Sequence, residues 1–239
     1  MPPACRVAAV IPTLNEAGAI GPTISALPRA MVDTVLVVDG GSTDGTVAEA
    51  RTAGAEVLIE RRPGYGRACA TGAARAATLG AEIVLFLDGD GADPAEEAGR
   101  LIEPLLAGEA DFALASRTRG PRAAGAMGFH QVVAGHLIGW LVGVVSGVHY
   151  TDMSAFRAIR RTRLEALGMQ EMTYGWNLEM QIRAAAAGLR IRELPLPYRR
   201  RLAGRSKVAG TLGGTLKASI HILATLLRTA GALRRGARA

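Results

Sequence analysis

Two aspartates, Asp88 and Asp90, follow the apolar run 83–87 and are separated by Gly89. Two carboxylates at this spacing can hold a hard divalent cation and leave several of its coordination positions open for phosphate oxygens. Without a cation, like charges this close repel each other and raise a pKa. The pattern therefore predicts a site for a cation and a phosphate-bearing ligand, although a polar turn after a strand would have the same composition.

The elements that position these acids are predicted from the apolar runs. Residues 83–87 lack polar alternation, which is typical of a strand buried on both faces of a mainly parallel sheet covered by helices. Similar runs at 6–11 and 33–39 alternate with helical stretches, so we expect an α/β, Rossmann-like fold. Ligands of such sheets bind beyond the carboxyl ends of the strands, so Asp39 and Asp88 should border one crevice.

Two further loops carry residues suited to a nucleotide. After the first strand, which Pro12 is expected to end, Asn15 and Glu16 either cap the next helix or face a nucleotide. A glycine-rich turn around Gly66 precedes another helix, and free amides at a helix start can receive phosphate. Cys69 stands where a dinucleotide-binding motif would need its last glycine, which disfavours an oxidoreductase.

Composition limits the partners that this chain can bind. The 239 residues carry a formal net charge of +7, and the basic ones crowd into 199–238, which favours a phosphate or an anionic membrane over duplex nucleic acid. Aromatic residues make up 4%, too few for a surface that binds single-stranded nucleic acid. Cys5 and Cys69 are too few for a disulfide framework or a zinc site, and no signal segment is recognisable, so we expect a cytoplasmic protein.

Two later segments are suited to contact with a membrane. Residues 131–148 are almost uncharged but short for a span and interrupted by His136, so they predict either a helix at the membrane interface or a buried core helix. Residues 208–233 repeat an apolar residue every three or four positions, which predicts an amphipathic helix that lies on an anionic bilayer or packs on the protein. We therefore expect a main domain over 1–207 and a helix with a basic tail over 208–239.

The segment between these two regions offers further charged groups. A basic helix is predicted to follow Arg157, and a second helix, over 176–187, carries Glu179 in its first turns, where it faces either the site or solvent. The segment 201–207 supplies cations, a hydroxyl and a glycine within seven residues, which suits either a phosphate grip or a solvated loop.

Five motifs occur together and in order, over residues 12–16, 38–46, 88–90, 116–117 and 201–207. With them, the stretch 6–207 resembles the family 2 glycosyltransferases of GT-A fold, and among these the dolichol-phosphate mannosyltransferase-like branch that acts on polyprenyl phosphates. Five ordered motifs are far more specific than any one of them alone. The resemblance implies an inverting, metal-dependent glycosyltransferase that moves a sugar from a nucleotide-sugar donor to a polyprenyl phosphate. Because the chain is predicted to have an amphipathic helix in place of added transmembrane helices, we expect its contact with the cytoplasmic face of the membrane to be peripheral.

The resemblance also implies roles for single residues. The donor would be held by Pro12, Thr13, Asn15, Glu16, Asp39, Gly66, Asp88 and Gly89. Asp90, with Asp88, would coordinate Mg²⁺ or Mn²⁺, which neutralises charge on the leaving nucleoside diphosphate. The acceptor phosphate would be held by Arg117, Arg201, Ser206 and Lys207. A phosphate acceptor needs no strong base, whereas a hydroxyl acceptor would need one, and Glu179 is the candidate.

Two departures from the family pattern are relevant. Relatives often have a glutamine two residues after the second aspartate, where this chain has Ala92 followed by Asp93, which either replaces that ligand or caps the next helix. Many relatives add transmembrane helices, whereas one amphipathic helix is predicted here. The alternatives that stay open are a transferase to a soluble hydroxyl acceptor, a nucleotidyltransferase, and an inactive membrane-surface binding module. No sequence feature predicts an oligomeric state.

Overall fold

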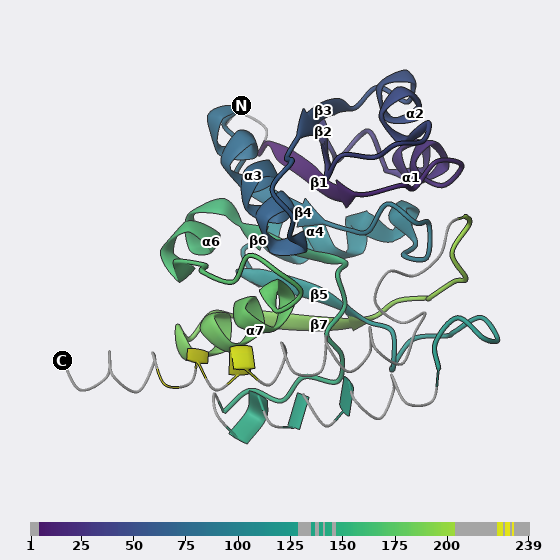
Figure 1. Ribbon diagram of the computed structural model, residues 1–239. Helices are drawn as coiled ribbons and strands as arrows, with labels where there is room; N and C mark the ends of the chain where they lie inside the picture. The colour runs from purple at the N-terminus through teal and green to yellow at the C-terminus, as the bar shows by residue number, and fades with distance from the viewer. Residues whose placement is uncertain are drawn as a thin grey trace.

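The computed structural model describes residues 5–128, 135–136, 139–140, 142–144, 147–203, 224–226, 228–229 and 231. These residues fold around a seven-stranded sheet with the order β3-β2-β1-β4-β6-β5-β7 (Figure 1). The strands are β1 (Val7–Thr13), β2 (Thr34–Asp39), β3 (Glu56–Ile59), β4 (Ile83–Phe86), β5 (Phe112–Ser116), β6 (Arg157–Arg160) and β7 (Ile191–Pro195). The helices are α1 (Ile20–Ala26), α2 (Thr46–Thr52), α3 (Tyr65–Thr78), the 3₁₀ turn η1 (Ala95–Glu97), α4 (Ala98–Leu106), α6 (Arg161–Leu167) and α7 (Trp176–Ala186).

The described sheet is mainly parallel, as the sequence predicts, with β6 as the strand that runs against its neighbours. Ala158 of β6 is paired with Leu85 of β4 and with Ala113 of β5, both antiparallel. The sequence predicted only a helix here, because β6 is four residues long and begins and ends with arginine, so no apolar run marks it. Burial of Ala158 and Ile159 between β4 and β5, and not a local pattern, makes this segment a strand.

The prediction that Pro12 ends the first strand was wrong, because β1 continues to Thr13. Proline has no N–H to give to a sheet ladder. On one side of β1, however, β4 pairs only as far as Val10, and on the other side Pro12 lies in register with Val38 of β2. At Pro12 the strand is therefore already an edge on the β4 side, which is where proline is tolerated.

Apolar side chains of β1 alternate between two cores, one on each face of the sheet. Val7 and Ala9 pack with α1, α2 and α4, whereas Ala8 and Val10 pack with α3, α6 and α7. Helix α3 approaches the sheet closely, because a Cβ at Gly72 would lie 2.3 Å from Val10 Cγ1. With both faces covered by helices, the ends of the strands are left for polar chemistry.

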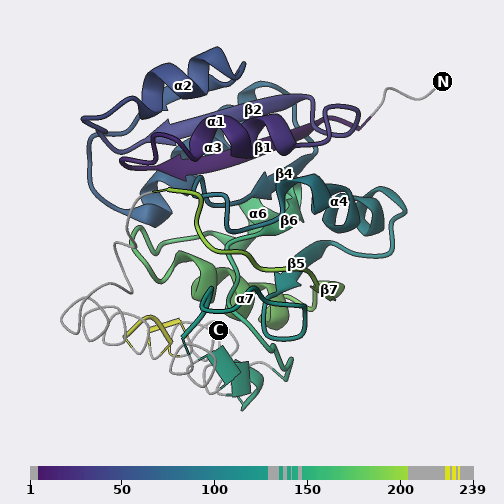
Figure 2. The same cartoon turned by 90° about the vertical axis from the view of Figure 1, so that its right-hand side faces the viewer.

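The segment after β7 crosses the edge of the sheet, and we call residues 196–203 the crossing segment. Figure 2 shows it running from β7 in front of the sheet toward β4 and β1. Its backbone is tied to the loop after β4, since the amides of Arg199 and Leu202 donate to the carbonyl oxygens of Ala92 and Asp90, both at 2.9 Å. The crossing segment thus lies over the carboxyl ends of β1 and β4.

The structure describes parts of both segments predicted to contact a membrane. Within 131–148, Val142 is buried, whereas Trp140 and Val144 are 55% and 65% exposed. Near the C-terminus, Leu226 packs in the same core as α7, and Arg228 pairs with Glu171, so this part packs on the protein. No helix within the described ranges is long and apolar enough to cross a membrane. The predicted domain boundary at 207 and most of the predicted C-terminal helix lie outside the described residues.

Candidate active site

Three aspartates that follow β4 form what we call the acid trio: Asp88, Asp90 and Asp93. The turn that carries them is tightly packed, because a Cβ at Gly89 would lie 2.8 Å from Thr13 Cγ2 of β1. Gly91 adopts a φ of +74°, a conformation that favours glycine. Both glycines therefore permit a tight turn that other residues could not form. This turn places three carboxylates within six residues after a central strand.

Electrostatics set the acid trio apart from ordinary surface carboxylates. Burial raises the pKa of Asp88 to about 6, and the charge of Asp90 adds to the rise. Burial, followed by the charges of Asp88 and Asp90, raises the pKa of Asp93 well above its usual value. A bound cation would relieve this repulsion, and perturbed carboxyl groups of this kind are typical of functional sites.

The carboxylates fit a divalent cation in the chemistry of their oxygen donors, but they do not complete its coordination. Among the described residues, no three His, Cys, Asp or Glu side chains are arranged to hold a metal ion by themselves. Mg²⁺ and similar ions commonly bind through one or two carboxylates together with phosphate oxygens of a substrate. The acid trio is therefore suited to an ion that arrives with a diphosphate.

Arg201 of the crossing segment lies directly on the acid trio. Its Nη1 donates to Asp90 Oδ2 at 2.5 Å, and its Nη2 donates to both carboxylate oxygens of Glu16, at 2.9 and 2.8 Å. The resemblance implied that Arg201 holds the acceptor phosphate. The structure instead places it on two acids expected at the donor side, because opposite charges attract most strongly where the carboxylates are buried.

Arg117, at the end of β5, is held by a residue that sequence reasoning missed. Its Nε and Nη2 donate to the two carboxylate oxygens of Asp152 at 2.7 and 2.8 Å, and its guanidinium lies 5.1 Å from the centre of the Tyr198 ring. Burial lowers the pKa of Arg117, but the hydrogen bonds and charge of Asp152 outweigh this effect, so the pKa lies above its usual value. The charge of Arg117 offsets part of the rise in the pKa of Asp88 and of Asp93, so it acts on the acid trio.

Tyr198 was missed together with Asp152. Burial raises the pKa of Tyr198 to about 12, and the charges of the acid trio contribute. Both residues left a faint signal in the sequence. Asp152 is a lone acid after a long uncharged stretch, and Tyr198 follows two prolines, Pro195 and Pro197, in a segment predicted only as a connection.

The loops after β1 and β2 are joined by hydrogen bonds. Asn15 has a φ of +52°, and its backbone N–H donates to Ser42 Oγ at 2.7 Å. Its side-chain Oδ1 accepts from the backbone N–H of Thr43 at 2.9 Å. Asp39 is 1% exposed, and its carboxylate accepts from the amides of Gly41 and Ser42 and from Thr13 Oγ1. These side chains build the two loops at the carboxyl edge. Their contact with a donor stays a prediction.

Gly66 does not offer its amide to a phosphate, contrary to the prediction. That amide donates to the carbonyl oxygen of Thr173 at 3.2 Å. A Cβ at Gly66 would lie 2.4 Å from the carbonyl oxygen of Glu171. The glycine is required because the start of α3 packs directly against the backbone of residues 171–173.

Glu179 also has a different role from the predicted general base. Its carboxylate accepts from the amides of Gln170 and Glu171 at 2.9 and 2.7 Å and pairs with Arg183 at 2.8 Å. The residue is 2% exposed. Its oxygens therefore fix the loop before α7 and are engaged by three donors, an arrangement that does not suit a general base. Ser206 and Lys207, predicted at the acceptor phosphate, lie outside the described residues.

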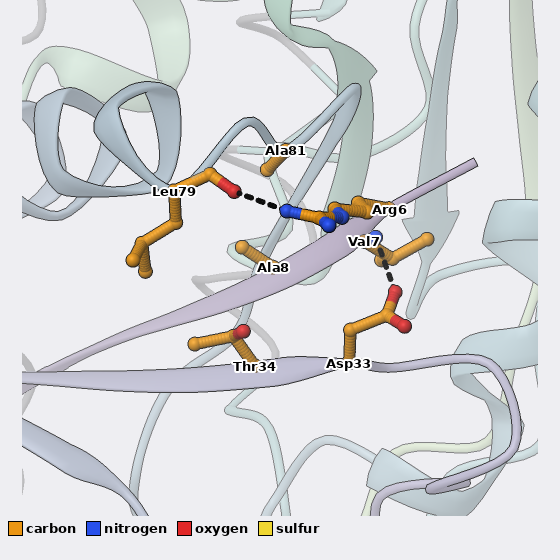
Figure 3. Close-up of a pocket in the computed structure, with 7 residues that line it drawn as sticks. All are labelled: Arg6, Val7, Ala8, Asp33, Thr34, Leu79 and Ala81. Atoms are coloured by element: carbon orange, nitrogen blue, oxygen red, sulfur yellow. Dashed lines mark hydrogen bonds between the residues drawn. The ribbon is translucent and has the colours of Figure 1, made fainter. Parts of the chain in front are cut away.

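Two cavities among the described residues lie away from these groups. Figure 3 shows a cavity of about 210 Å³ at the amino ends of β1 and β2, where Arg6 Nη1 donates to the Leu79 carbonyl and the Val7 amide donates to Asp33. A groove of about 510 Å³ lies between α3 and α6 and is lined by four alanines of α3 together with residues of α6, the loop after it and Trp176. The polar groups suited to catalysis are gathered at the carboxyl edge instead.

Comparisons with known proteins agree with this arrangement. A sequence model of glycosyl transferase family 2 matches residues 8–168. A Mycobacterium tuberculosis protein named as an uncharacterised glycosyltransferase is 36% identical over 210 residues, covering 88% of this chain and 93% of the relative. The undecaprenyl-phosphate mannosyltransferase of Micrococcus luteus is 31% identical over 224 residues, covering 87% of this chain and 90% of the relative.

Solved structures match the fold as well. Glucosyl-3-phosphoglycerate synthase of Mycobacterium tuberculosis, in complex with Mn²⁺ and UDP-glucose, has a TM-score of 0.71 at 25% identity, and the match covers 95% of this chain and 80% of that one. The expected GT-A fold is confirmed. With a family match over most of the chain, this protein belongs to glycosyl transferase family 2 and is a glycosyltransferase of the hexosyltransferase type.

Proposed function

We propose that this glycosyltransferase moves a sugar from a nucleotide-sugar donor to a polyprenyl phosphate, with Mg²⁺ or Mn²⁺, at the cytoplasmic surface of a membrane. The observation that carries the proposal is the pairing of the acid trio with two arginines, Arg117 and Arg201, at one edge of the sheet. Carboxylates bind a divalent cation, which in turn binds the donor diphosphate, whereas arginines bind an acceptor phosphate directly. Two phosphate-bearing substrates need such a divided site.

The chain's own residues then have separate tasks. Asp90 and Asp88 hold the cation, which when bound neutralises the charge that builds up on the leaving diphosphate. The loops after β1 and β2, with Pro12, Asn15 and Asp39, form the expected nucleotide side. Arg117, fixed by Asp152, holds the acceptor phosphate, and Ser206 and Lys207 are proposed to join it.

The state of Glu179 favours a phosphate acceptor. A hydroxyl acceptor needs a base to remove its proton, whereas an ionised phosphate oxygen attacks without one. Glu179, the base considered for a hydroxyl, is bound by two amides and Arg183. The name of the Micrococcus luteus relative, an undecaprenyl-phosphate mannosyltransferase, supports the same acceptor class.

The second candidate is a transferase to a soluble acceptor. It is favoured by the fold match to glucosyl-3-phosphoglycerate synthase, whose name states a small phosphorylated acceptor. The membrane location separates the two candidates. We propose that the apolar stretch 131–148, with Trp140 and Val144 exposed, and the amphipathic helix predicted over 208–233 contribute to a peripheral contact with lipid.

Organic extraction tests the proposal directly. The purified protein is incubated with a panel of radiolabelled nucleotide sugars, Mn²⁺ and undecaprenyl phosphate, and the label in the organic phase is counted. We expect one donor to give an extractable product and the Asp90→Asn variant to give none. Label that is transferred only to a water-soluble phosphorylated acceptor would favour the second candidate. No transfer to either acceptor class would refute both.

A further inference from the structure

Arg201 satisfies two acids that come from different strands. Glu16 follows β1 and Asp90 follows β4, and the guanidinium bridges them with hydrogen bonds of 2.5 to 2.9 Å. The side chains of Glu16 and Asp90 are 10% and 6% exposed, so both acids are largely removed from water. A positive charge at this position lowers the cost of keeping the two carboxylates ionised.

Each carboxylate oxygen of Asp90 already accepts a hydrogen bond while Arg201 is in place. Its Oδ1 accepts from the Ala92 amide at 2.9 Å, and its Oδ2 accepts from Arg201. A divalent cation needs direct contact with a carboxylate oxygen. Because a guanidinium and a cation would also repel each other at this distance, only one of them can bind Asp90 Oδ2 at a time.

Arg201 is suited to leave this position. Its side chain is 28% exposed and comes from the crossing segment, which lies outside the described helices and strands. Its Nε is buried without a hydrogen-bond partner in the part of the chain that the structure describes, so the bridge leaves one strong donor unpaired. A second arrangement, in which a phosphate takes these donors, would satisfy more of them.

We propose that Arg201 occupies the cation position of Asp90 until the donor and its ion displace it, and that the displaced guanidinium then binds the acceptor phosphate. This inference rests on the proposed function and adds an order to it. The donor frees the residue that the acceptor needs, so the acceptor phosphate binds tightly only after the donor. A cation that binds alone must compete with Arg201, and its apparent affinity is reduced by the fraction of molecules in which Arg201 is bound to Asp90.

Binding of Mn²⁺ alone, followed by electron paramagnetic resonance of the free ion, tests this competition without any sugar transfer. We expect Arg201→Gln to bind Mn²⁺ about tenfold more tightly than the unmodified protein, the scale of one lost competing charge. Arg201→Lys, which keeps the charge, should fall between the two. In the assay with polyprenyl phosphate, Arg201→Gln should show a raised KM for the acceptor and a lowered KM for the donor, because the donor and its ion no longer have to displace a guanidinium.

Arg199→Gln is the matched control, because it removes the same charge from the same crossing segment. Its side chain pairs with the exposed Glu96 and does not touch the acid trio. Its Mn²⁺ affinity should equal that of the unmodified protein. The inference is overturned if Arg201→Gln binds Mn²⁺ no more tightly, or if Arg199→Gln gains as much. Failure of the proposed function would give a different result, because Asp90→Asn would then bind Mn²⁺ as tightly as the unmodified protein does.

Discussion

Asp152 holds Arg117 by three hydrogen bonds, two from the guanidinium and one, at 2.8 Å, from the backbone amide of the same residue. Asp152 is in turn fixed by its own backbone, since its amide donates to Glu193 at 3.1 Å and its carbonyl accepts from Gln181 at 2.9 Å. The carboxylate is 2% exposed. The Arg117 side chain is thereby held in one orientation before any ligand binds, which reduces the conformational entropy that is lost on binding.

This lock predicts the effect of Asp152→Asn. The amide keeps the shape but loses the charge, so Arg117 should become mobile and bind the acceptor phosphate less well. We expect the KM for polyprenyl phosphate to rise about tenfold, with the KM for the donor unchanged. Steady-state kinetics with each substrate varied in turn measures both. Equal changes in the two KM values would mean that Asp152 supports the whole site and not Arg117 in particular.

Asp111→Asn is the matched control for that variant and carries a prediction of its own. Asp111 lies next to the opposite end of β5, and hydrogen bonds from Arg190 lower its pKa to about 2. Because the folded value is below the unfolded value of about 4, Asp111 stabilises the fold above pH 4, and this contribution is lost as the pH falls from 4 to 2.

We therefore expect Asp111→Asn to lose roughly 2 kcal/mol of unfolding free energy at pH 7 and almost none at pH 2. Urea denaturation at the two pH values measures the loss, and the KM values of folded Asp111→Asn should stay unchanged. A loss of the same size at both pH values would show that packing, and not charge, accounts for the role of Asp111.

Asp88 should show the opposite dependence on pH. Burial, with the charge of Asp90, raises its pKa to about 6, so the folded protein binds a proton more readily than the unfolded chain between pH 4 and 6. Stability without a cation should rise as the pH falls through this range. Asp88→Asn imitates the protonated form and should unfold at a higher temperature than the unmodified protein at pH 8, but at nearly the same temperature at pH 4.

Thermal melts with and without Mn²⁺ check this prediction. The ion should raise the midpoint of the unmodified protein at pH 8 and have little effect on Asp88→Asn. A lower midpoint for Asp88→Asn at pH 8 would contradict the assignment of Asp88 as a carboxylate kept ionised at a cost to stability.

Gly66→Ala tests the close packing at the start of α3. The new Cβ would lie 2.4 Å from the Glu171 carbonyl oxygen, so the loop before α7 must move, at a cost of about 1 to 3 kcal/mol. Gly21→Ala in α1 is the control, because its Cβ would be 3.9 Å from the nearest atom, and it should be neutral or slightly stabilising. Chemical denaturation compares them, and equal stability of the two variants would refute the packing argument.

The sequence predicts the parts of this fold that depend on local pattern. The apolar run before Asp88 marks β4, and the runs before Thr13 and Asp39 mark β1 and β2, because strands buried on both faces need continuous apolar residues. β6 could not be found this way, since its four residues become a strand only through pairing with β4 and β5. The family itself was recognisable because its motifs occur in order.

The sequence is less informative about which partner a charged side chain selects. Glu179 and Arg201 were assigned to the site by residue type and by resemblance, but their partners are decided by chain segments that meet only after folding. Glu179 meets two amides of the loop before α7, and Arg201 meets Glu16. The pairing of Arg117 with Asp152 spans 35 residues and belongs to the same class of contact.

The bridge between Arg201 and Glu16 joins positions 185 residues apart. Arg201 follows β7, which pairs with β5 at the far edge of the sheet, because the crossing segment begins where β7 ends. A ribosome must therefore have released almost all of the main domain before this contact forms. A partly synthesised chain already carries Glu16 and Asp90 but not the arginine that bridges them, so this site is completed from both ends of the described sheet.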